Sequence, residues 1–240
     1  MILLVLVAAA AGYLLAVRRG RRPWPGRRTA AWLAGLGCAA AGTALADHGD
    51  LRRHMAAHLL VGMVAPLLLV LAAPGTLALR TLRPPAARRL ARVLRSAPAR
   101  VLTDPFVAVA VDTAGLVLLY RSPVLMAAMH STVLGALVWA HVLLTGWLAT
   151  AAVLALDPTP HRRGVAARAV ALALAMAAHD VLATSLTAWP PAGWTHADAG
   201  AQLMVQGGTL VELAVAALLW QRWYASRDAV RAAERAAAPA

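Results

Sequence analysis

The stretch "HMAAHLLVGMVAPLLLVLAAP" at residues 54–74 decides the fold. The run that follows His58 carries no charged side chain before Arg80. At ~1.5 Å per residue, a helix of that length crosses the roughly 30 Å hydrocarbon core of a membrane. The sequence therefore predicts a transmembrane helix over residues 55–79. A second histidine, His54, stands one helical turn before His58, and the function of this pair depends on which side of the membrane it faces.

The composition is that of a membrane protein. Of the 240 residues, 61% are hydrophobic and only 14% are charged, and the mean hydropathy is +0.66. A soluble domain averages about 45–50% apolar and ~25% charged residues. Apolar runs alternate with arginine clusters, so the sequence predicts an all-α bundle of about seven transmembrane helices, forming a single integral membrane domain over residues 1–240. The predicted spans are 1–17, 29–46, 55–79, 103–120, 130–156, 165–188 and 200–221, and a cytoplasmic tail follows over 222–240.

The arginines determine the predicted orientation. All 23 basic residues are arginine. With seven spans, all of them except Arg52, Arg53 and Arg121 fall on one side of the membrane. Cytoplasmic loops carry the excess of basic residues, so we expect a multi-pass plasma-membrane protein with its N-terminus outside and its C-terminus in the cytoplasm. The first span has its basic cluster after it rather than before it, so we interpret it as a retained helix and not as a cleavable signal peptide.

The net charge of +13 does not indicate nucleic-acid binding, and we expect no nucleic-acid partner. The arginines stand in short clusters between apolar runs, which is the pattern that sets membrane orientation. The basic loop 80–102 has spaced leucine and valine residues, which predicts an amphipathic helix on the anionic inner leaflet. Trp189 and Trp194 fit an aromatic belt at the outer interface. A single cysteine, Cys38, excludes an internal disulfide framework and a cysteine-rich metal site.

Histidine and methionine gather toward the outer half of the predicted bundle. The candidate metal ligands are His54, Met55, His58, Met63, His130, His141 and His179. Imidazole and thioether groups together suit copper, particularly Cu(I), better than magnesium or calcium, which take oxygen ligands. Zinc bound through histidine and carboxylate stays open. Polar residues inside spans are costly and normally face the bundle interior, and those that we expect to support the site are Asp112, Asp180, Gln202, Gln206 and Glu212.

His54 and His58 form the strongest local pattern, since residues four apart on a helix face the same way. We expect this pair to capture the ion at the outer surface, with the other candidates as deeper positions toward the middle of the membrane. The sequence leaves other roles open. His141, inside a span, serves equally well for hydrogen bonding between helices, and an isolated methionine is more often core filler than a ligand. Asp112 and Glu212 also fit interhelical hydrogen bonds.

The segment "HMAAHLLVGMVAPLLLVLAAPGTLALRTL" resembles the core segment of the bacterial CtaG-like cytochrome c oxidase assembly proteins, the branch associated with caa-type oxidases. The residues that carry the resemblance are His54, Met55, His58, Leu59, Leu60, Ala65, Pro66, Pro74 and Arg80. Looser similarities follow at "DPFVA" (104–108), "HVLLTGWL" (141–148), "DPTPHR" (157–162) and "QLMVQGG" (202–208). Membership implies a plasma-membrane protein that helps supply copper to cytochrome c oxidase during its assembly, with oxidase subunits as partners. We expect no enzymatic activity.

Other functions lead to different expectations. A copper importer or copper-tolerance protein would use the same ligands along a path through the bundle. A membrane cytochrome b would use His141 and His179 as axial haem ligands, and we favour copper over haem. A rhodopsin-type photoreceptor is excluded, because its Schiff base needs a lysine and the chain has none. An intramembrane serine protease is disfavoured by the surroundings of Ser185, which offer no serine–histidine or serine–lysine pair. The oligomeric state is left undefined by the sequence.

Overall fold

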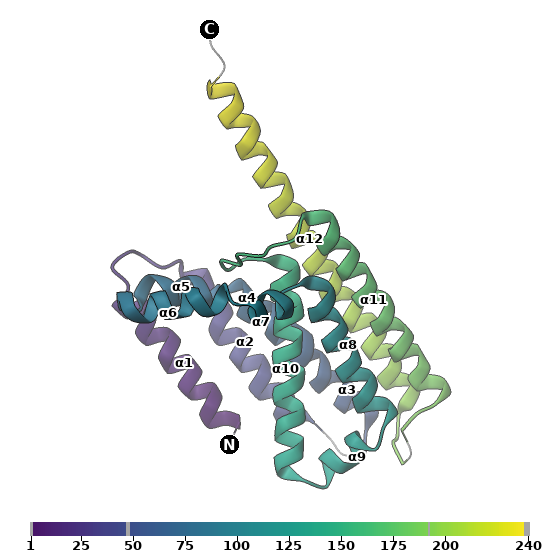
Figure 1. Ribbon diagram of the computed structural model, residues 1–240. Coiled ribbons are helices and arrows are strands. Elements are labelled where there is room, and N and C mark those ends of the chain that lie inside the picture. The colour runs from purple at the N-terminus through teal and green to yellow at the C-terminus, as the bar shows by residue number, and fades with distance from the viewer. Residues whose placement is uncertain (1, 47–48, 192, 238–240) are drawn as a thin grey trace.

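The computed structural model describes residues 2–46, 49–191 and 193–237, and throughout these ranges the named elements are helices. In chain order they are α1 (Ile2–Arg19), α2 (Gly26–Leu45), α3 (Leu51–Leu59), η1 (Leu60–Val64), α4 (Ala65–Leu71), α5 (Pro74–Thr81), α6 (Pro84–Leu94), α7 (Ala97–Leu102), α8 (Pro105–Arg121), α9 (Val124–Met129), α10 (Thr132–Leu154), α11 (Val165–Ala188) and α12 (Ala197–Ala237). Figure 1 shows the long helices side by side, whereas α5 and α6 lie across one end of them. The prediction of an all-α protein is confirmed.

Five stretches of the described residues are long and apolar enough to cross a membrane. They are Ile2–Arg19, Leu51–Thr81, Thr132–Leu154, Val165–Ala188 and Ala197–Asp228. The other two predicted spans are helical but are not among these five. α2 begins with two arginines and is rich in weakly apolar alanine and glycine, and α8 has only 17 residues. Both nevertheless pack within the bundle, α2 against α4 and α8 against α10 and α11.

The central helix runs from α3 through η1 into α4, and its middle turn is a widened π-helical turn. Pro66 has no amide hydrogen, and in a regular helix its ring would collide with the carbonyl group of Gly62. The wider turn relieves this conflict, because the amide of Ala65 donates to the carbonyl of Leu60, five residues back. The carbonyl of Gly62 then lies against Gly146 of α10, where an added Cβ would come within 2.2 Å of it. Glycine at this point therefore lets α10 approach the central helix closely.

The predicted span 55–79 is longer than the observed helix, which ends at Leu71. Ala73 then adopts a φ of 49°, a left-handed conformation that is uncommon outside glycine, and α5 continues in a new direction (Figure 1). The carbonyl of Ala72 accepts a 2.9 Å hydrogen bond from the hydroxyl of Tyr13 in α1. Because the last carbonyls of a helix lack partners within it, this bond both satisfies the helix end and holds the turn against α1.

A distant loop caps the start of α5. The carboxylate of Asp157 accepts hydrogen bonds from the backbone amides of Gly75 (2.9 Å) and Thr76 (2.6 Å), and from the hydroxyl of Thr76 (2.7 Å). The first amides of a helix have no partner inside the helix, so this carboxylate takes the place of a local N-cap side chain. The segment "DPTPHR" therefore has a structural role, in which its aspartate ties the loop after α10 to α5.

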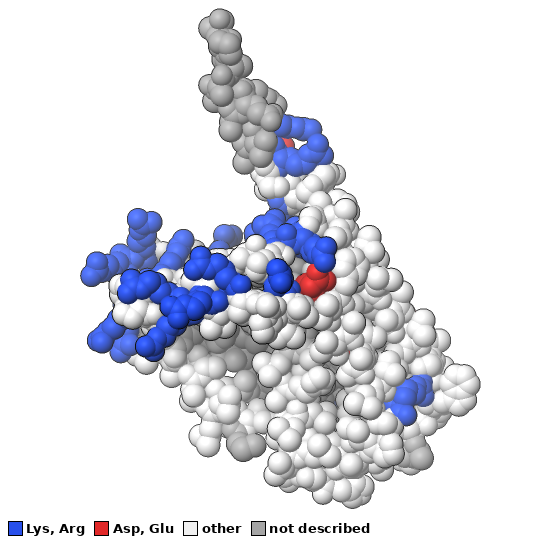
Figure 2. All heavy atoms as spheres, viewed as in Figure 1, with Lys and Arg blue, Asp and Glu red and all other residues white. Residues whose placement is uncertain are grey.

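Basic side chains gather at the end of the bundle where α5 and α6 lie, as Figure 2 shows. α6 has no buried residue, and its arginines Arg88, Arg89 and Arg92 are exposed. The amphipathic helix predicted within residues 80–102 is thus present over Pro84–Leu94. That it lies on the inner leaflet stays a prediction.

Candidate metal centre

His54 and His58 lie inside the bundle, with only 6% and 2% of their surface exposed. We predicted a position at the outer surface, and the structure differs because the segment before α12 covers the start of α3. Trp194 packs over His54, with ring centroids 5.1 Å apart, and the amide of Leu51 donates to the carbonyl of Thr195 at 3.0 Å. The two histidines do share one face of α3, as their four-residue spacing predicts.

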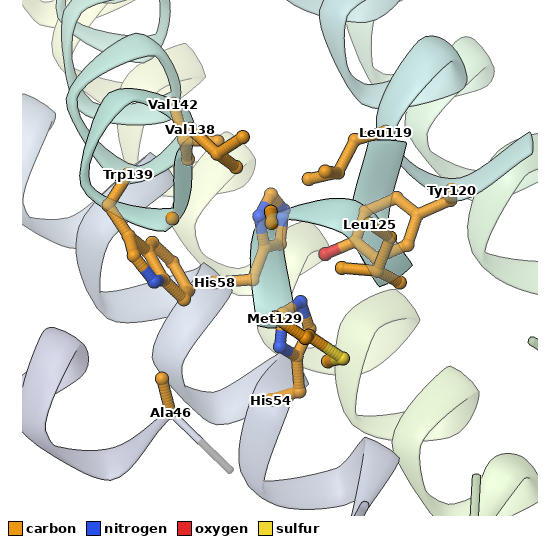
Figure 3. A pocket seen from close by; sticks show the side chains of 12 residues that line it. Ala46, His54, His58, Leu119, Tyr120, Leu125, Met129, Val138, Trp139 and Val142 are labelled. Atoms are coloured by element: carbon orange, nitrogen blue, oxygen red, sulfur yellow. The ribbon is translucent and has the colours of Figure 1, made fainter. Parts of the chain in front are cut away.

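Aromatic rings form the walls around the two histidines. The ring of Tyr120 in α8 is nearly perpendicular to both imidazoles, at 5.9 Å from His54 and 6.1 Å from His58. Trp139 in α10 lies 5.6 Å from His54. Figure 3 shows the imidazoles with Tyr120 on one side and Trp139 on the other. The histidines of α3 are therefore enclosed by α8, α10 and the segment before α12.

A cavity of about 50 Å³ lies between these rings. Its lining includes His54, His58, Tyr120, Trp139 and the sulfur-bearing side chain of Met129 (Figure 3). One water molecule takes up ~30 Å³ in the liquid. A space of this size is large enough for a single metal ion or for water.

His179 from α11 completes the group of buried histidines. Its ring is parallel to that of His58 within 17°, and the two ring centroids are 6.1 Å apart. Within the described ranges, neither nitrogen of either ring has a hydrogen-bond partner. Leaving a buried polar group without a partner costs about 1–3 kcal/mol, and such groups are few in native proteins. These ring nitrogens are therefore available to bind an ion or a water molecule in the adjoining cavity.

Two carboxylates lie close to His179. The Nδ1 atom of His179 is 4.0 Å from Oε1 of Glu212 in α12, and one ligand atom from each of His179, Asp180 and Glu212 lies within 4.8 Å of the other two. Glu212 is 6% exposed, and its Oε2 has no hydrogen-bond partner among the residues that the structure describes. A buried carboxylate without partners is costly. A cation bound between the imidazole and the carboxylate would stabilise both groups.

Asp112, the other intramembrane acid expected to support the site, already has a partner. The hydroxyl of Thr145 in α10 donates a 2.7 Å hydrogen bond to Oδ1 of Asp112 in α8. This bond is the interhelical role that the sequence left open for Asp112. Glu212, which lies beside His179, is therefore a stronger candidate for binding a cation than Asp112.

Two further cavities continue from the histidines toward the middle of the bundle. One, of about 50 Å³, is lined in part by His58, His179, Met63, Asp112 and Glu212. The next, of about 70 Å³, shares Met63, Asp112 and Glu212 with it. Since the cavity beside Tyr120 also includes His58, the three cavities form a series along which nitrogen, sulfur and oxygen groups alternate with apolar side chains.

Glycines make room for the two facing imidazoles. A Cβ added to Gly208 of α12 would lie 2.3 Å from Cε1 of His179, closer than two carbon atoms can approach. A Cβ added to Gly62 would lie 3.2 Å from Cε1 of His58. α12 therefore passes directly against the ring of His179, and the glycine at the end of "QLMVQGG" has a steric reason to be there.

Three predicted ligands lie away from these cavities. Met55 is fully buried in the apolar core, on another face of α3 from the histidines. His130 is exposed, and its ring Nδ1 is bonded to the carbonyl of Met126, 2.7 Å away. His141 is exposed as well, with its ring against Gly115 of α8. The structure therefore does not bring these side chains together with His58 and His179.

Gln202 and Gln206 are exposed, and our expectation that these amides face the bundle interior was wrong. The buried face of α12 carries Met204, Gly208 and Glu212. That face lies two residues, or about 200°, around the helix axis from the glutamines. An exposed amide on a helix that packs inward through another face cannot reach the cavities.

Two residues of the first cavity, Tyr120 and Met129, were not among the predicted site residues. The position of Met129 in the outer half of the predicted bundle was the one signal that pointed to it. Nothing in the local sequence distinguishes Tyr120, because its importance comes from the approach of α8 to the histidines of α3.

The donor groups along the cavities fit a soft or borderline metal ion. Imidazole suits copper and zinc, and thioether sulfur selects Cu(I); Met63 and Met129 supply the thioethers. Histidine binds a metal only through an unprotonated nitrogen, and the ring nitrogens of His58 and His179 have no hydrogen-bond partner within the described chain. The site therefore has the chemistry to bind a copper ion within the bundle.

Comparisons with known proteins identify the family. The sequence profile described as "Cytochrome c oxidase caa3 assembly factor (Caa3_CtaG)" matches residues 11–226. The chain is also 34% identical over 169 residues to an uncharacterized protein of Mycobacterium bovis and to one of Mycobacterium tuberculosis. Each match covers 65% of this chain and 25% of the relative, so the chain spans about a quarter of the length of the curated relatives it matches. No solved structure matches significantly. The chain belongs to the family of cytochrome c oxidase caa3 assembly factors.

Proposed function

We propose that this protein binds copper(I) inside its helical bundle and helps deliver it to cytochrome c oxidase while the oxidase is assembled. It does so without being an enzyme. The observation that carries the proposal is the pair of facing, buried imidazoles of His58 and His179, whose four nitrogens lack hydrogen-bond partners among the described residues. The family supplies the recipient, since its description is that of an assembly factor for this oxidase.

In this proposal each group has a distinct task. His58 and His179 hold the ion. Glu212, whose Oε1 lies 4.0 Å from Nδ1 of His179, offsets the positive charge of the ion. His54 lies next to this pair in the neighbouring cavity, near Met129, and receives the ion on entry. Aromatic rings around the histidines leave little room for a hydration shell, which favours a soft cation with few ligands over a strongly hydrated one. Zinc uses the same imidazoles, and the thioethers are the groups that favour Cu(I) over it.

The proposed topology has seven spans in the plasma membrane, with the N-terminus outside and the C-terminus in the cytoplasm. The five strongly apolar stretches supply part of this set, and α2 and α8, which pack among them, supply the rest. Basic side chains gather at one end of the bundle (Figure 2), and cytoplasmic loops are the basic ones. The histidine cavities then open toward the extracytoplasmic end.

Reporter fusions test this topology. A reporter that works only in the cytoplasm is expected to be active when fused after Ala240, and a reporter that works only outside is expected to be inactive there. A fusion within the loop after Trp189 should give the reverse pattern. If the reporter fused after Ala240 is active only as an extracytoplasmic enzyme, the proposed topology is wrong.

Copper import or copper tolerance is the second candidate function, and the series of cavities favours it. The third cavity extends past Glu212 to Thr150 and Val153, beyond the facing imidazoles. Ligand groups along such a series would let an ion advance from one position to the next. Uptake of copper into vesicles that contain the purified protein separates this candidate from delivery alone.

A haem-binding cytochrome is not supported. His141 and His179, the axial pair that a haem would need, lie apart, since His141 is exposed against Gly115. The cavity that His179 lines measures about 50 Å³, and a porphyrin is many times larger. A purified protein without a Soret band is the expected result.

Metal analysis of the purified protein tests the proposed function directly. We expect one tightly held copper ion per chain after incubation with Cu(I) under reducing conditions and removal of excess metal. Zinc offered at the same concentration is expected to bind more weakly, because thioether sulfur selects the softer ion. Elemental analysis measures both. Copper content near zero, in protein shown to be folded by its helical circular dichroism, would contradict the proposal.

A further inference from the structure

A groove of about 540 Å³ lies at the basic end of the bundle and shares no lining residue with the histidine cavities. Its walls come from the end of α1, the loop before α2, the end of α5 and the connection to α6. Five arginines line it, namely Arg19, Arg21, Arg22, Arg80 and Arg83. Figure 2 shows basic side chains concentrated around α5 and α6. The groove thus combines a concave shape with a high density of positive charge.

One wall of the groove is anchored to the bundle through Trp24. The indole N–H of Trp24 donates a 2.9 Å hydrogen bond to the hydroxyl of Tyr13, which in turn donates to the carbonyl of Ala72. The guanidinium of Arg80 lies over the indole ring, 5.6 Å from its centroid. Such cation–π contacts restrain an arginine that would otherwise move freely. The groove is therefore built from positioned side chains and not only from loose loop residues.

The positive charge of the groove is not neutralised within the described chain. No salt bridge in that part of the protein joins one of the five groove arginines to a carboxylate. Two acids near this end are engaged elsewhere, because Asp104 pairs with Arg163 at 2.7 Å and Asp157 caps α5. The five groove arginines are therefore available to pair with an anionic group from outside the described chain.

The geometry points to an anionic phospholipid headgroup as the ligand of this groove, bound in the leaflet that surrounds the basic end of the bundle. Guanidinium groups hold phosphate oxygens through paired hydrogen bonds, and ligand sites commonly measure about 300–1,000 Å³. The groove also contains Val17, Leu77 and Leu82, which offer apolar contact to the glycerol and the first acyl carbons. A soluble phosphate ion would use only the arginines.

This inference does not rest on copper binding, because the groove shares no residue with the histidine cavities. It gives the arginines around α5 a function beyond setting the orientation of the protein. A lipid held between α1 and the α5–α6 connection would fix these elements to each other and to the membrane.

Native mass spectrometry of the full-length protein released from detergent tests the assignment. The protein is given equal amounts of phosphatidylglycerol and phosphatidylcholine, and the lipid retained per chain is counted. We expect one phosphatidylglycerol to be retained in preference. A direct hydrogen bond to a charged group contributes about a factor of ten in affinity, so the double variant Arg80→Gln with Arg83→Gln is expected to bind the anionic lipid about 100-fold more weakly.

The matched control is Arg88→Gln with Arg92→Gln, which removes the same charge from exposed positions of α6 outside the groove. It is expected to retain the lipid almost as well as the wild type. If the Arg80 variant fails to fold, Arg19→Gln with Arg22→Gln removes charge from the opposite wall and is expected to give the same loss.

Three results would overturn the assignment. Equal losses in the groove variants and in the control would show attraction by diffuse charge. Displacement of the lipid by an excess of inorganic phosphate would show that the groove binds a soluble anion. No preference of the wild type for phosphatidylglycerol over phosphatidylcholine would show that the groove does not recognise the charged headgroup.

Discussion

Replacing His58 and His179 together by alanine is expected to abolish stoichiometric copper(I) binding while the protein still folds and inserts. The ring centroids of the two imidazoles are 6.1 Å apart, and their nitrogens have no hydrogen-bond partner within the described residues. Changes to groups that merely orient a ligand already cost about 10–100-fold in metal affinity. Loss of two direct ligands should therefore lower the affinity by at least about 100-fold, and competition with a Cu(I) chelator measures it.

The matched control for this variant is the double replacement of His130 and His141 by alanine. It removes the same side-chain type from two exposed positions outside the cavities, so copper affinity should stay close to that of the wild type. Thermal unfolding of the metal-free protein adds a second readout. If the imidazoles hold the helices together, their loss lowers the unfolding temperature without copper; if they are ligands, copper should raise that temperature only in the wild type.

The same variants also connect binding to the family function. In cells grown with limiting copper, a strain that lacks the gene should have low cytochrome c oxidase activity. The wild-type gene and the His130 and His141 variant should restore it, and the His58 and His179 variant should not. If the His58 and His179 variant fully restored cytochrome c oxidase activity, oxidase assembly would not depend on the proposed site. Copper import would then be the favoured function.

The sequence was informative about the helices and about α3 because those features depend on local spacing. Four residues between His54 and His58 place both on one face of any helix, and the structure has them so. The π-helical turn after them was not foreseen. Predicting this turn requires knowing that the helix relieves the conflict created by Pro66 by widening one turn and not by bending. It also requires knowing that Gly146 of α10 leaves space for the carbonyl of Gly62.

The assembly of the site depended on contacts that no local pattern encodes. Met55 and Met63 looked alike in sequence, yet the first packs in the core and the second lines the cavities. On α12, Gln202, Gln206 and Glu212 were all assigned to the interior, but packing against α3 and α11 turns only Glu212 inward. The positions of the polar residues alone did not reveal which face of this helix points into the bundle. The small residues on its buried face, above all Gly208, were the better signal.

Gly208→Ala is the second change for which we expect a large effect. It alters the site only by adding a methyl group and replaces none of the proposed ligands. The new methyl group would lie 2.3 Å from Cε1 of His179, so the ring or α12 must move. Alanine is about 1 kcal/mol more favourable than glycine in a helix interior, which partly compensates the strain in the folded protein. No polar atom is added or lost, so reduced copper binding would report a displaced imidazole. We expect affinity to fall by about tenfold or more, as for other changes that misplace a metal ligand.

Two other glycines separate displacement of His179 from general effects of alanine. Gly207→Ala places its methyl group 2.4 Å from Cδ1 of Leu59, a flexible apolar side chain that is not a ligand. It should lower thermal stability while largely keeping copper affinity. Gly37→Ala in α2 meets nothing within 4 Å and should leave affinity unchanged and stability slightly higher. Chelator competition and thermal unfolding are measured on all three. If Gly208→Ala binds copper as tightly as Gly37→Ala, the position of His179 does not control the metal, and the ion must be held elsewhere along the cavities.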